Sequence, residues 1–197
     1  MLNKIEAHGI TGDILRWIGE WLKDREQRVV LNGIMSAWIY VVSGVPQGSI
    51  LGPLLFLIFI NDIDKNIVNK LLKFADDTKL CGKVSSDSDA DQMQADLRQL
   101  FDWSIDWQML FNVDKCKIVH FGYKNNRNFY YLGSNVIKSD IEEKDLGVIV
   151  HESLKSTSQC VAAAKSANIT LDMIRRTFID NNCKTFLQLY QSLSGQN

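Results

Sequence analysis

The four residues Phe74-Ala75-Asp76-Asp77 place two adjacent acids between two short apolar runs, Leu71-Leu72 and Leu80-Cys81. This pattern predicts a strand, a tight turn and a second strand over about residues 71–81. Such a turn presents two carboxylates at nearly the same point of a rigid hairpin. Like charges held that close are costly unless a cation lies between them, so the pattern predicts a divalent metal ion. Asp pairs are also common in turns for purely local reasons, so the turn alone leaves both interpretations open.

Composition sets wide limits on the class of protein. The chain has 197 residues, 46% of them hydrophobic, which fits one medium domain or one and a half small ones and allows a sizeable core. A formal net charge of −1 lacks the basic excess of a free-standing nucleic-acid binder, although local patches matter more than the sum. The four cysteines have no C-x-x-C spacing, which predicts reduced thiols and an intracellular protein of the cytoplasm or nucleus.

Periodicity and turn signals give the expected order of elements. Helices are expected at 1–8, from a cap at Thr11 to Leu22, and from Pro53 through a fully buried segment at Leu54 to Ile60. That apolar stretch is roughly half as long as a membrane-spanning helix, and no signal peptide is visible. A hairpin is expected from strands at 25–31 and 34–42, which meet at Asn32-Gly33. A helix is expected within 85–114, with a capping box of Ser88 and Asp91. Strands are then expected at 117–121, 130–132 and 146–150, followed by helices from residue 153. Antiparallel hairpins with helices on one face make an α+β fold.

The segment from Ser43 to Leu54 is the second candidate for function. Its glycines allow a substrate to approach the main chain closely, and Gln47 can both donate and accept hydrogen bonds. The helix that begins near Pro53 offers free N–H groups to an anion. The plainer interpretation is a loop that leads into a buried helix.

Three ordered segments together resemble the reverse transcriptase of non-LTR, LINE-type retrotransposons, of the jockey and chicken-repeat branch. They are Ser43 to Leu54, Phe74-Ala75-Asp76-Asp77, and Asn112-Val113-Asp114-Lys115. The resemblance continues through Glu142 to Val148 and on to about Tyr190. It implies a right-hand polymerase, with a partial palm over 1–150 and a partial helical thumb over 151–197.

The resemblance also implies roles for individual residues. Asp76 and Asp77 correspond to metal-binding, catalytic acids, and Phe74 stands where the family has Tyr. Lys115 corresponds to the lysine that protonates the pyrophosphate leaving group, with Lys117 as a second candidate. Nucleotide and template binding is implied for Gly44, Pro46, Gln47, Gly48 and Phe74, and the primer grip for Leu146, Gly147 and Val148. The implied cofactor is Mg²⁺ or Mn²⁺, and the implied partners are an RNA template, a DNA primer and dNTP, with no membrane.

The family's third metal-binding acid comes from an earlier palm strand with a Phe-and-Asp motif, and nothing in Met1 to Gly12 resembles it. We therefore expect a fragment with an incomplete metal site, poor solubility and weak or no polymerase activity alone. Two alternatives remain. One is a non-catalytic nucleic-acid-binding remnant that uses Lys165, Arg175 and Arg176, and the other is a decayed retroelement product without function.

Overall fold

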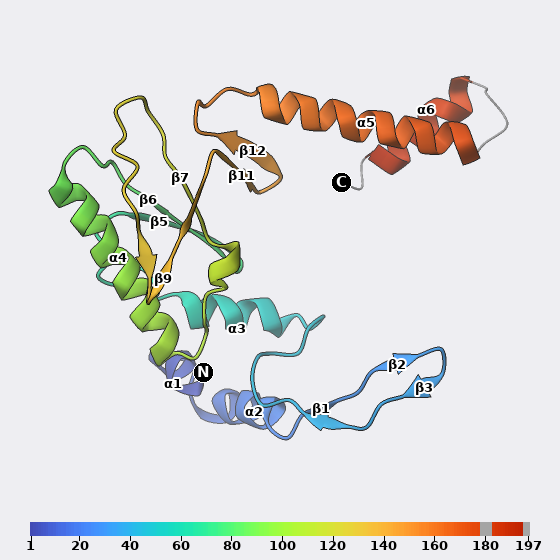
Figure 1. The fold of residues 1–197 in the computed structure, drawn as a ribbon. Helices are drawn as coiled ribbons and strands as arrows, with labels where there is room; N and C mark the ends of the chain where they lie inside the picture. The colour runs from blue at the N-terminus through green and yellow to red at the C-terminus, as the bar shows by residue number, and fades with distance from the viewer. Residues whose placement is uncertain (178–182, 195–197) are drawn as a thin grey trace. The chain divides into compact units, whose positions relative to one another are not determined.

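The computed structural model describes residues 1–177 and 183–194, which divide into two compact units, Met1–Met109 and Leu110–Asn197 (Figure 1). Each unit mixes helices and strands, as expected for an α+β chain. The division of the chain into palm and thumb near residue 150 remains a prediction. No helix in the described ranges has both the length and the apolar character needed to cross a membrane.

The first unit contains four helices among its described residues. They are α1 (Leu2–Ala7), α2 (Gly12–Leu22), α3 (Leu51–Ile60) and α4 (Asp87–Asp106). Its strands are β1 (Glu26–Gln27), β2 (Val30–Leu31), β3 (Ile34–Met35), β4 (Ile39–Tyr40), β5 (Lys70–Phe74) and β6 (Asp77–Cys81). The buried side chains Ile5, Ile18 and Leu55 form a core where α1, α2 and α3 meet.

The second unit begins with a short 3-10 helix, η1 (Val113–Lys115). Its strands are β7 (Lys117–Val119), β8 (Tyr131–Leu132), β9 (Asn135–Val136), β10 (Lys138–Asp140), β11 (Glu142–Asp145) and β12 (Val148–His151). Its helices are α5 (Thr157–Thr177) and α6 (Cys183–Ser194). Helix α5 packs on α6 and on β12. The basic residues Lys165, Arg175 and Arg176 all lie on α5.

The strands of the described residues pair two by two. Five pairs are antiparallel, and β7 with β10 is parallel. The expectation of one antiparallel sheet therefore differs from the structure. The antiparallel pairs other than β1–β4 close across short turns, where joining two strands costs little chain entropy. The parallel pair joins segments about twenty residues apart, which no local turn signal in the sequence could reveal.

Three predicted elements are corrected in the segment before the acidic turn. The strands expected over 25–31 and 34–42 are each broken, into β1 and β2 and into β3 and β4, because the pairing of β2 with β3 ends at Val29 and Ser36. Helix α3 is not buried on all sides, since Leu54 and Leu57 are half exposed. Its buried positions are Gly52, Leu55 and Ile60, which shows that the described elements cover only part of its circumference.

The N-terminal cap of α4 also differs from the prediction. The capping box uses Ser86 and Asp89 rather than Ser88 and Asp91. The Asp89 N–H donates to the Ser86 hydroxyl at 3.2 Å, and the Asp89 carboxylate accepts from the N–H groups of Ser85 and Ser86. Because Ser and Asp alternate through this segment, the same spacing occurs at both places, and the extended backbone of Ser86 selects the earlier one. Thr11 stands at the N-cap of α2 as predicted, but its side chain makes no capping hydrogen bond.

Candidate metal-binding turn and its surroundings

The acidic turn, defined here as residues 74–77, has the predicted hairpin geometry. Strands β5 and β6 pair from Lys70 with Cys81 to Phe74 with Asp77, so Ala75 and Asp76 are the two turn residues. Ala75 has φ +49°. A non-glycine residue in this left-handed region is uncommon and costs about 1–2 kcal/mol. A two-residue hairpin turn calls for positive φ at this position, and seven other non-glycine residues in the described ranges share it, so the strain reports the turn geometry and does not by itself mark a functional site.

Both carboxylates of the turn are open to solvent. Asp76 and Asp77 are exposed, and neither carboxylate makes a hydrogen bond or an ion pair within the described ranges, while the backbone of Asp77 pairs with Phe74. Phe74 beside them is 63% exposed. Two free carboxylates present the hard oxygen ligands that Mg²⁺ and Mn²⁺ prefer, so the donors fit such an ion. Across residues 1–177 and 183–194, no three His, Cys, Asp or Glu side chains gather as a metal-binding group.

The glycine loop, residues 43–49, is held in shape by its own hydrogen bonds. The Ser49 hydroxyl donates to the Pro46 carbonyl at 2.8 Å and accepts from the Gly52 N–H at 2.9 Å. Gly44 and Gly48 have φ of +80° and +77°, which only glycine adopts without strain. Gln47 and Gly48 are exposed, so the side chain and the backbone at the loop tip are accessible.

The start of α3 is closely packed against this loop. A Cβ atom on Gly52 would lie 3.0 Å from the Pro46 carbonyl oxygen, so a larger residue there would push the loop. The Gly44 carbonyl accepts a hydrogen bond from Arg25 at 2.6 Å, which ties the loop to the residue before β1. No hydrogen bond or ion pair of the described chain joins the glycine loop to the acidic turn.

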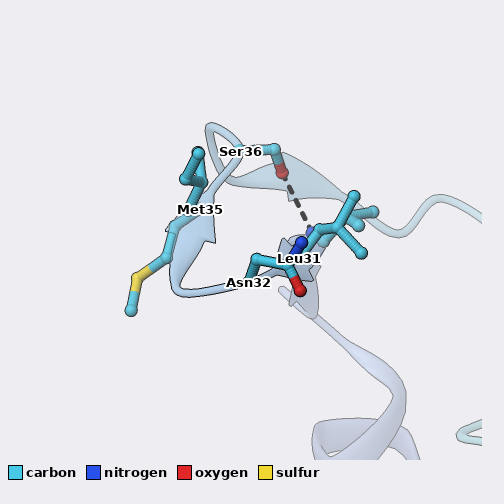
Figure 2. A pocket seen from close by; sticks show the side chains of 6 residues that line it. Leu31, Asn32, Met35 and Ser36 are labelled. Carbon is cyan, nitrogen blue, oxygen red and sulfur yellow. Dashed lines mark hydrogen bonds between the residues drawn. The ribbon is translucent and has the colours of Figure 1, made fainter.

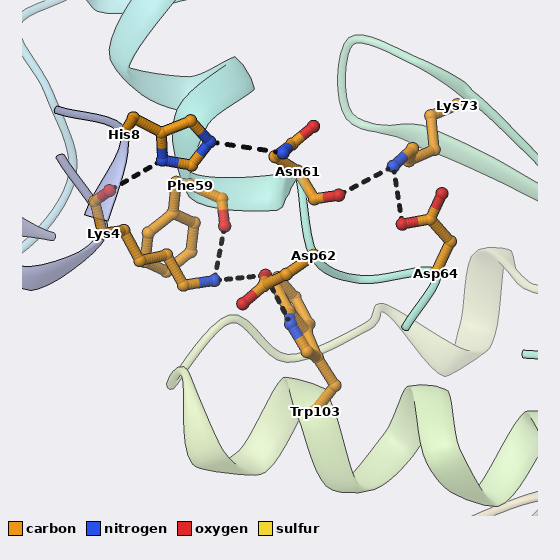
Figure 3. A network of polar contacts seen from close by, with 8 residues as sticks. All are labelled: Lys4, His8, Phe59, Asn61, Asp62, Asp64, Lys73 and Trp103. Carbon is orange, nitrogen blue, oxygen red and sulfur yellow. Dashed lines mark hydrogen bonds and ion pairs between the residues drawn. The ribbon is translucent and has the colours of Figure 1, made fainter. Parts of the chain in front are cut away.

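A polar network attaches β5 to the core of the first unit (Figure 3). The Lys73 ammonium lies 3.1 Å from the Asp64 carboxylate and 3.3 Å from the Asn61 carbonyl, in the segment that follows α3. The Asn61 side-chain amide lies 3.3 Å from the Nε2 atom of His8, just after α1. Lys73 directly precedes Phe74, so this contact holds the strand next to the acidic turn.

A buried lysine lies at the centre of the same network. The Lys4 ammonium donates to the Phe59 carbonyl at 2.6 Å and to Asp62 at 2.5 Å, and it lies 3.6 Å from the centre of the Trp107 ring. The Trp103 indole also donates to Asp62, at 3.0 Å. Partial burial acts to raise the pKa of Asp62, but these two donors outweigh it and lower the pKa. These contacts hold α1, α3 and α4 together next to the segment where Lys73 attaches β5.

The two lysine candidates of the second unit differ in their surroundings. Lys117, on β7, lies 2.7 Å from Glu143 and 3.1 Å from Asp140, and the hydrogen bonds to these two acids raise its pKa. Lys115, at the end of η1, is exposed, and its ammonium makes no hydrogen bond or ion pair in the described part of the chain, although its backbone N–H donates to the Asn112 carbonyl at 3.0 Å. Lys115 is thus available to an external group, whereas Lys117 connects β7 to the β10 and β11 strands.

The segment predicted as the primer grip is a tight hairpin turn. Asp145 pairs with Val148, so Leu146 and Gly147 are its two central residues, with φ of +46° and +89°. Positive φ at both positions is the arrangement that suits the twist of a two-residue hairpin. Leu146 is exposed, so an apolar side chain stands at the tip of a strained turn.

Asp96 is a buried residue that sequence reasoning missed. It lies on α4 and is 1% exposed, with hydrogen bonds to the residues just before β5. A signal was present in the sequence. Asp96 follows Met93 by three residues and precedes Leu100 by four, so an acid stands on the apolar face of the helix.

A hollow of about 350 Å³ lies on the β2–β3 hairpin and is lined by none of these candidates (Figure 2). It is lined by Val29, Leu31, Asn32, Ile34, Met35 and Ser36. None of these side chains titrates or is a nucleophile of the kind that metal or acid–base chemistry needs, so the hollow adds nothing to the candidate site.

Comparison with known proteins identifies the family. A family model described as reverse transcriptase (RNA-dependent DNA polymerase) matches residues 1–136. The chain belongs to the reverse transcriptase family. The match spans the glycine loop, the acidic turn and Lys115, whereas the Leu146–Gly147 turn of this reverse transcriptase chain lies beyond it. No solved structure matches the chain.

Three curated relatives of this reverse transcriptase chain are polymerases of mobile elements. The RNA-directed DNA polymerase from mobile element jockey of Drosophila funebris is 28% identical over 155 residues, which cover 74% of the chain and 17% of the relative. The jockey polymerase of Drosophila melanogaster is 31% identical over 114 residues, and the probable RNA-directed DNA polymerase from transposon X-element of the same species is 32% identical over 110 residues. Each of these two matches covers 53% of the chain and 12% of the relative. The chain thus spans less than a fifth of the curated relatives it matches.

Proposed function

We propose that this chain supplies the metal-binding turn and the adjoining palm of an RNA-directed DNA polymerase. Its substrates would be a DNA primer, an RNA template and dNTP, inside the cell and away from membranes. The observation that carries the proposal is the acidic turn, because two exposed and unpaired carboxylates stand on one strained hairpin within a chain of the reverse transcriptase family.

Asp76, Asp77 and Lys115 would carry the chemistry of nucleotidyl transfer. Asp76 and Asp77 would hold Mg²⁺ or Mn²⁺, which when bound supplies charge stabilisation to the attacking and leaving oxygens of nucleotidyl transfer. Lys115 would donate a proton to, or neutralise, the pyrophosphate leaving group, because its ammonium is free to reach an external anion. Lys117 is not proposed for this step, because Glu143 and Asp140 already pair with it.

The backbone supplies the binding surfaces in this proposal. Gly44, Pro46, Gln47 and Gly48 would shape the pocket for the template base and the incoming nucleotide, with Phe74 packing at the primer end. Leu146, Gly147 and Val148 would contact the primer as a hairpin tip. The palm would extend over 1–150 and the start of the thumb over 151–197.

We further propose that residues 1–197 alone bind the metal weakly, because two carboxylates leave an ion that dehydrates reluctantly with few protein ligands. Activity would then need a third acid supplied by the longer polymerase. The test is primer extension on an RNA template with Mg²⁺ or Mn²⁺. It compares three proteins: residues 1–197, a chain extended upstream through the palm strand that carries the family's third acid, and the extended chain with Asp76→Ala.

We expect extension from the upstream-extended chain, at least a hundredfold less from Asp76→Ala, and little from residues 1–197. Robust DNA synthesis by residues 1–197 would contradict the proposal that two carboxylates hold the metal too weakly for activity. No synthesis by the extended chain would contradict the polymerase proposal. Salt-dependent binding of a primer–template duplex without extension would instead favour a nucleic-acid-binding remnant, and an aggregated chain without either property would favour a decayed product.

A further inference from the structure

Asp96 makes an unusual set of hydrogen bonds for a helical acid. Its carboxylate is buried on α4 and accepts four hydrogen bonds, from the N–H of Val68 at 3.1 Å, the N–H of Asn69 at 2.8 Å, the side-chain amide of Asn69 at 2.9 Å and that of Gln92 at 3.0 Å. Three of the four donors belong to the two residues that lead into β5. The carboxylate therefore binds mainly the entry of the acidic hairpin, and Gln92 of α4 supplies the fourth donor.

The exit of the hairpin closes on the same point. Gly82 directly follows β6, and a Cβ atom placed on it would lie 2.2 Å from the Asn69 side-chain oxygen and 2.5 Å from the Met93 methyl group. A Cβ atom there would have to displace the ends of the Asn69 and Met93 side chains, and moving the Asn69 amide would disturb its hydrogen bond to Asp96. Asp96, Asn69 and Gly82 together form what we call the hairpin clamp, with Met93 of α4 against it.

The hairpin depends on this clamp for its direction. No third strand pairs with β5 or β6 among the described residues, and a lone two-stranded hairpin is marginally stable in water. Its attachments on the first unit include the clamp at the base and the Lys73 contacts to Asp64 and Asn61 beside the tip. The acidic turn stands at the far end of five strand pairs, so a small tilt at the base displaces both carboxylates.

We infer that Asp96 is a positioning residue of the polymerase: it fixes the base of the β5–β6 hairpin on α4 and thereby sets where Asp76 and Asp77 stand. The inference rests on the proposed function of the acidic turn. Asp96 contacts neither the turn nor any substrate-binding residue named above, so its effect passes entirely through the backbone of β5 and β6.

A purely apolar residue would not substitute for Asp96. Leucine at this position would leave the N–H groups of Val68 and Asn69 without their acceptors, and such groups are costly when buried. Asparagine keeps the shape but turns an NH₂ group toward N–H donors, so it loses part of the clamp. Asp96→Asn is therefore the narrowest change that opens the clamp, and Asp102→Asn, an exposed acid on the same helix, is the matched control.

The first measurement is amide hydrogen exchange on residues 1–197. In Asp96→Asn we expect about tenfold or more faster exchange at residues 68–82, with α1 and α2 unchanged and Asp102→Asn like the unmodified chain. Unchanged exchange at 68–82 would overturn the inference. Equally fast exchange throughout Met1–Met109 would also overturn it, since Asp96 would then be an ordinary core residue.

If Asp96→Asn fails to fold, the hairpin clamp can be tested with Gly82→Ala and with the double variant Asn69→Ala and Gly82→Ala. Gly82→Ala should open the same clamp by displacing the Asn69 amide. The double change Asn69→Ala with Gly82→Ala removes the closest clash, so its exchange at 68–82 should be slower than that of Gly82→Ala alone. If the double variant is as fast or faster, Asn69 and Gly82 do not act through one contact and the clamp is wrong.

The second measurement uses the upstream-extended polymerase. Asp96→Asn should raise the Mn²⁺ concentration for half-maximal primer extension by about tenfold, while KM for primer–template stays within about twofold. An unchanged metal requirement would overturn the positioning role. If the unmodified extended chain and Asp102→Asn both fail to extend a primer, the proposed function fails instead, and amide exchange alone decides whether Asp96 holds the hairpin.

Discussion

At the scale of single residues, the candidate site combines exposed acids with a strained backbone. The carboxylates of Asp76 and Asp77 have no partners within the described ranges, and Ala75 between Phe74 and Asp76 has φ +49°. A two-residue hairpin turn itself calls for positive φ at its first central residue, which is Ala75. The two neighbouring acids repel each other, and their position is explained if the turn serves a cation that arrives from outside.

Replacing Ala75 by glycine tests the strain. Because glycine reaches positive φ without a Cβ clash, Ala75→Gly should stabilise the first unit by about 0.5–1 kcal/mol despite the greater entropy of the unfolded chain. Urea unfolding followed by circular dichroism measures this change. A loss of stability would show that the turn is not strained, and Thr78→Gly, in the adjoining strand, is the control that should destabilise.

Asp96 should make stability depend on pH in acid. Burial acts to raise the pKa of Asp96, but the hydrogen bonds from Asn69, Val68 and Gln92 outweigh it and hold the pKa below its usual value. A lowered folded pKa means that its stabilisation is fully present above the unfolded value near 3.9 and is lost as the pH falls through the folded pKa. Asp96→Asn should cost about 1–3 kcal/mol at pH 7, and this deficit should shrink below about pH 4.

Thermal or urea unfolding of both chains from pH 7 down to pH 3 measures the effect. The partners of Asp96 are neutral amides, so no second titrating group in direct hydrogen bond with it would mask the trend. A deficit that stays constant down to pH 3 would contradict the assignment of an ionised Asp96.

At the scale of elements, each hairpin and helix is set largely by local chemistry. The capping box of Ser86 and Asp89 satisfies free N–H groups at the start of α4. This helix carries Asp96 and Trp103, so its start and register matter to both the hairpin clamp and the Lys4 network. A change at the Ser86 N-cap should therefore affect the position of Asp96, ten residues further along α4.

Removing the N-terminal cap should destabilise α4, beginning at its first turn. Ser86→Ala is expected to cost about 1 kcal/mol, because the Asp89 N–H loses its acceptor. Ser88→Ala is the matched control, since Ser88 lies inside the helix and makes no cap. Unfolding by urea compares the two, and an equal cost for both would contradict the observed capping box.

Sequence reasoning reached the local elements but not their long-range pairing. The acidic hairpin and the Asn32-Gly33 hairpin were predicted because alternation and turn residues lie within one segment. The parallel pairing of Lys117 with Lys138, and the clamp of Asp96 on Asn69, join segments with no shared local signal. The sequence does not distinguish a cap at Ser88 from one at Ser86, because the two spacings are identical and only the backbone conformation separates them.

At the scale of the whole molecule, the described chain exposes much apolar surface. The segment from Val29 to Val42 carries nine large apolar side chains that are more than half exposed: Val29, Val30, Leu31, Ile34, Met35, Trp38, Ile39, Tyr40 and Val42. Monomeric proteins rarely expose contiguous apolar patches of this kind. The chain spans less than a fifth of its curated relatives, and the proposal that it works within a longer polymerase would account for such a surface.

This surface should make residues 1–197 self-associate. We expect binding of an apolar dye and concentration-dependent light scattering, both reduced when Ile34 and Val42 are changed to Thr. Exchanging the exposed Thr157 for Ser is a control that should change neither. A monodisperse unmodified chain that binds no dye would contradict the prediction.

The most direct test of the central claim replaces a proposed metal ligand by one that prefers another metal. In the upstream-extended chain, Asp76→Cys should abolish primer extension with Mg²⁺ and recover part of it with Mn²⁺ or Cd²⁺, because thiolate disfavours Mg²⁺. Asp102→Cys should keep full activity with Mg²⁺. Full Mg²⁺ activity in Asp76→Cys would contradict the claim that the acidic turn holds the catalytic metal.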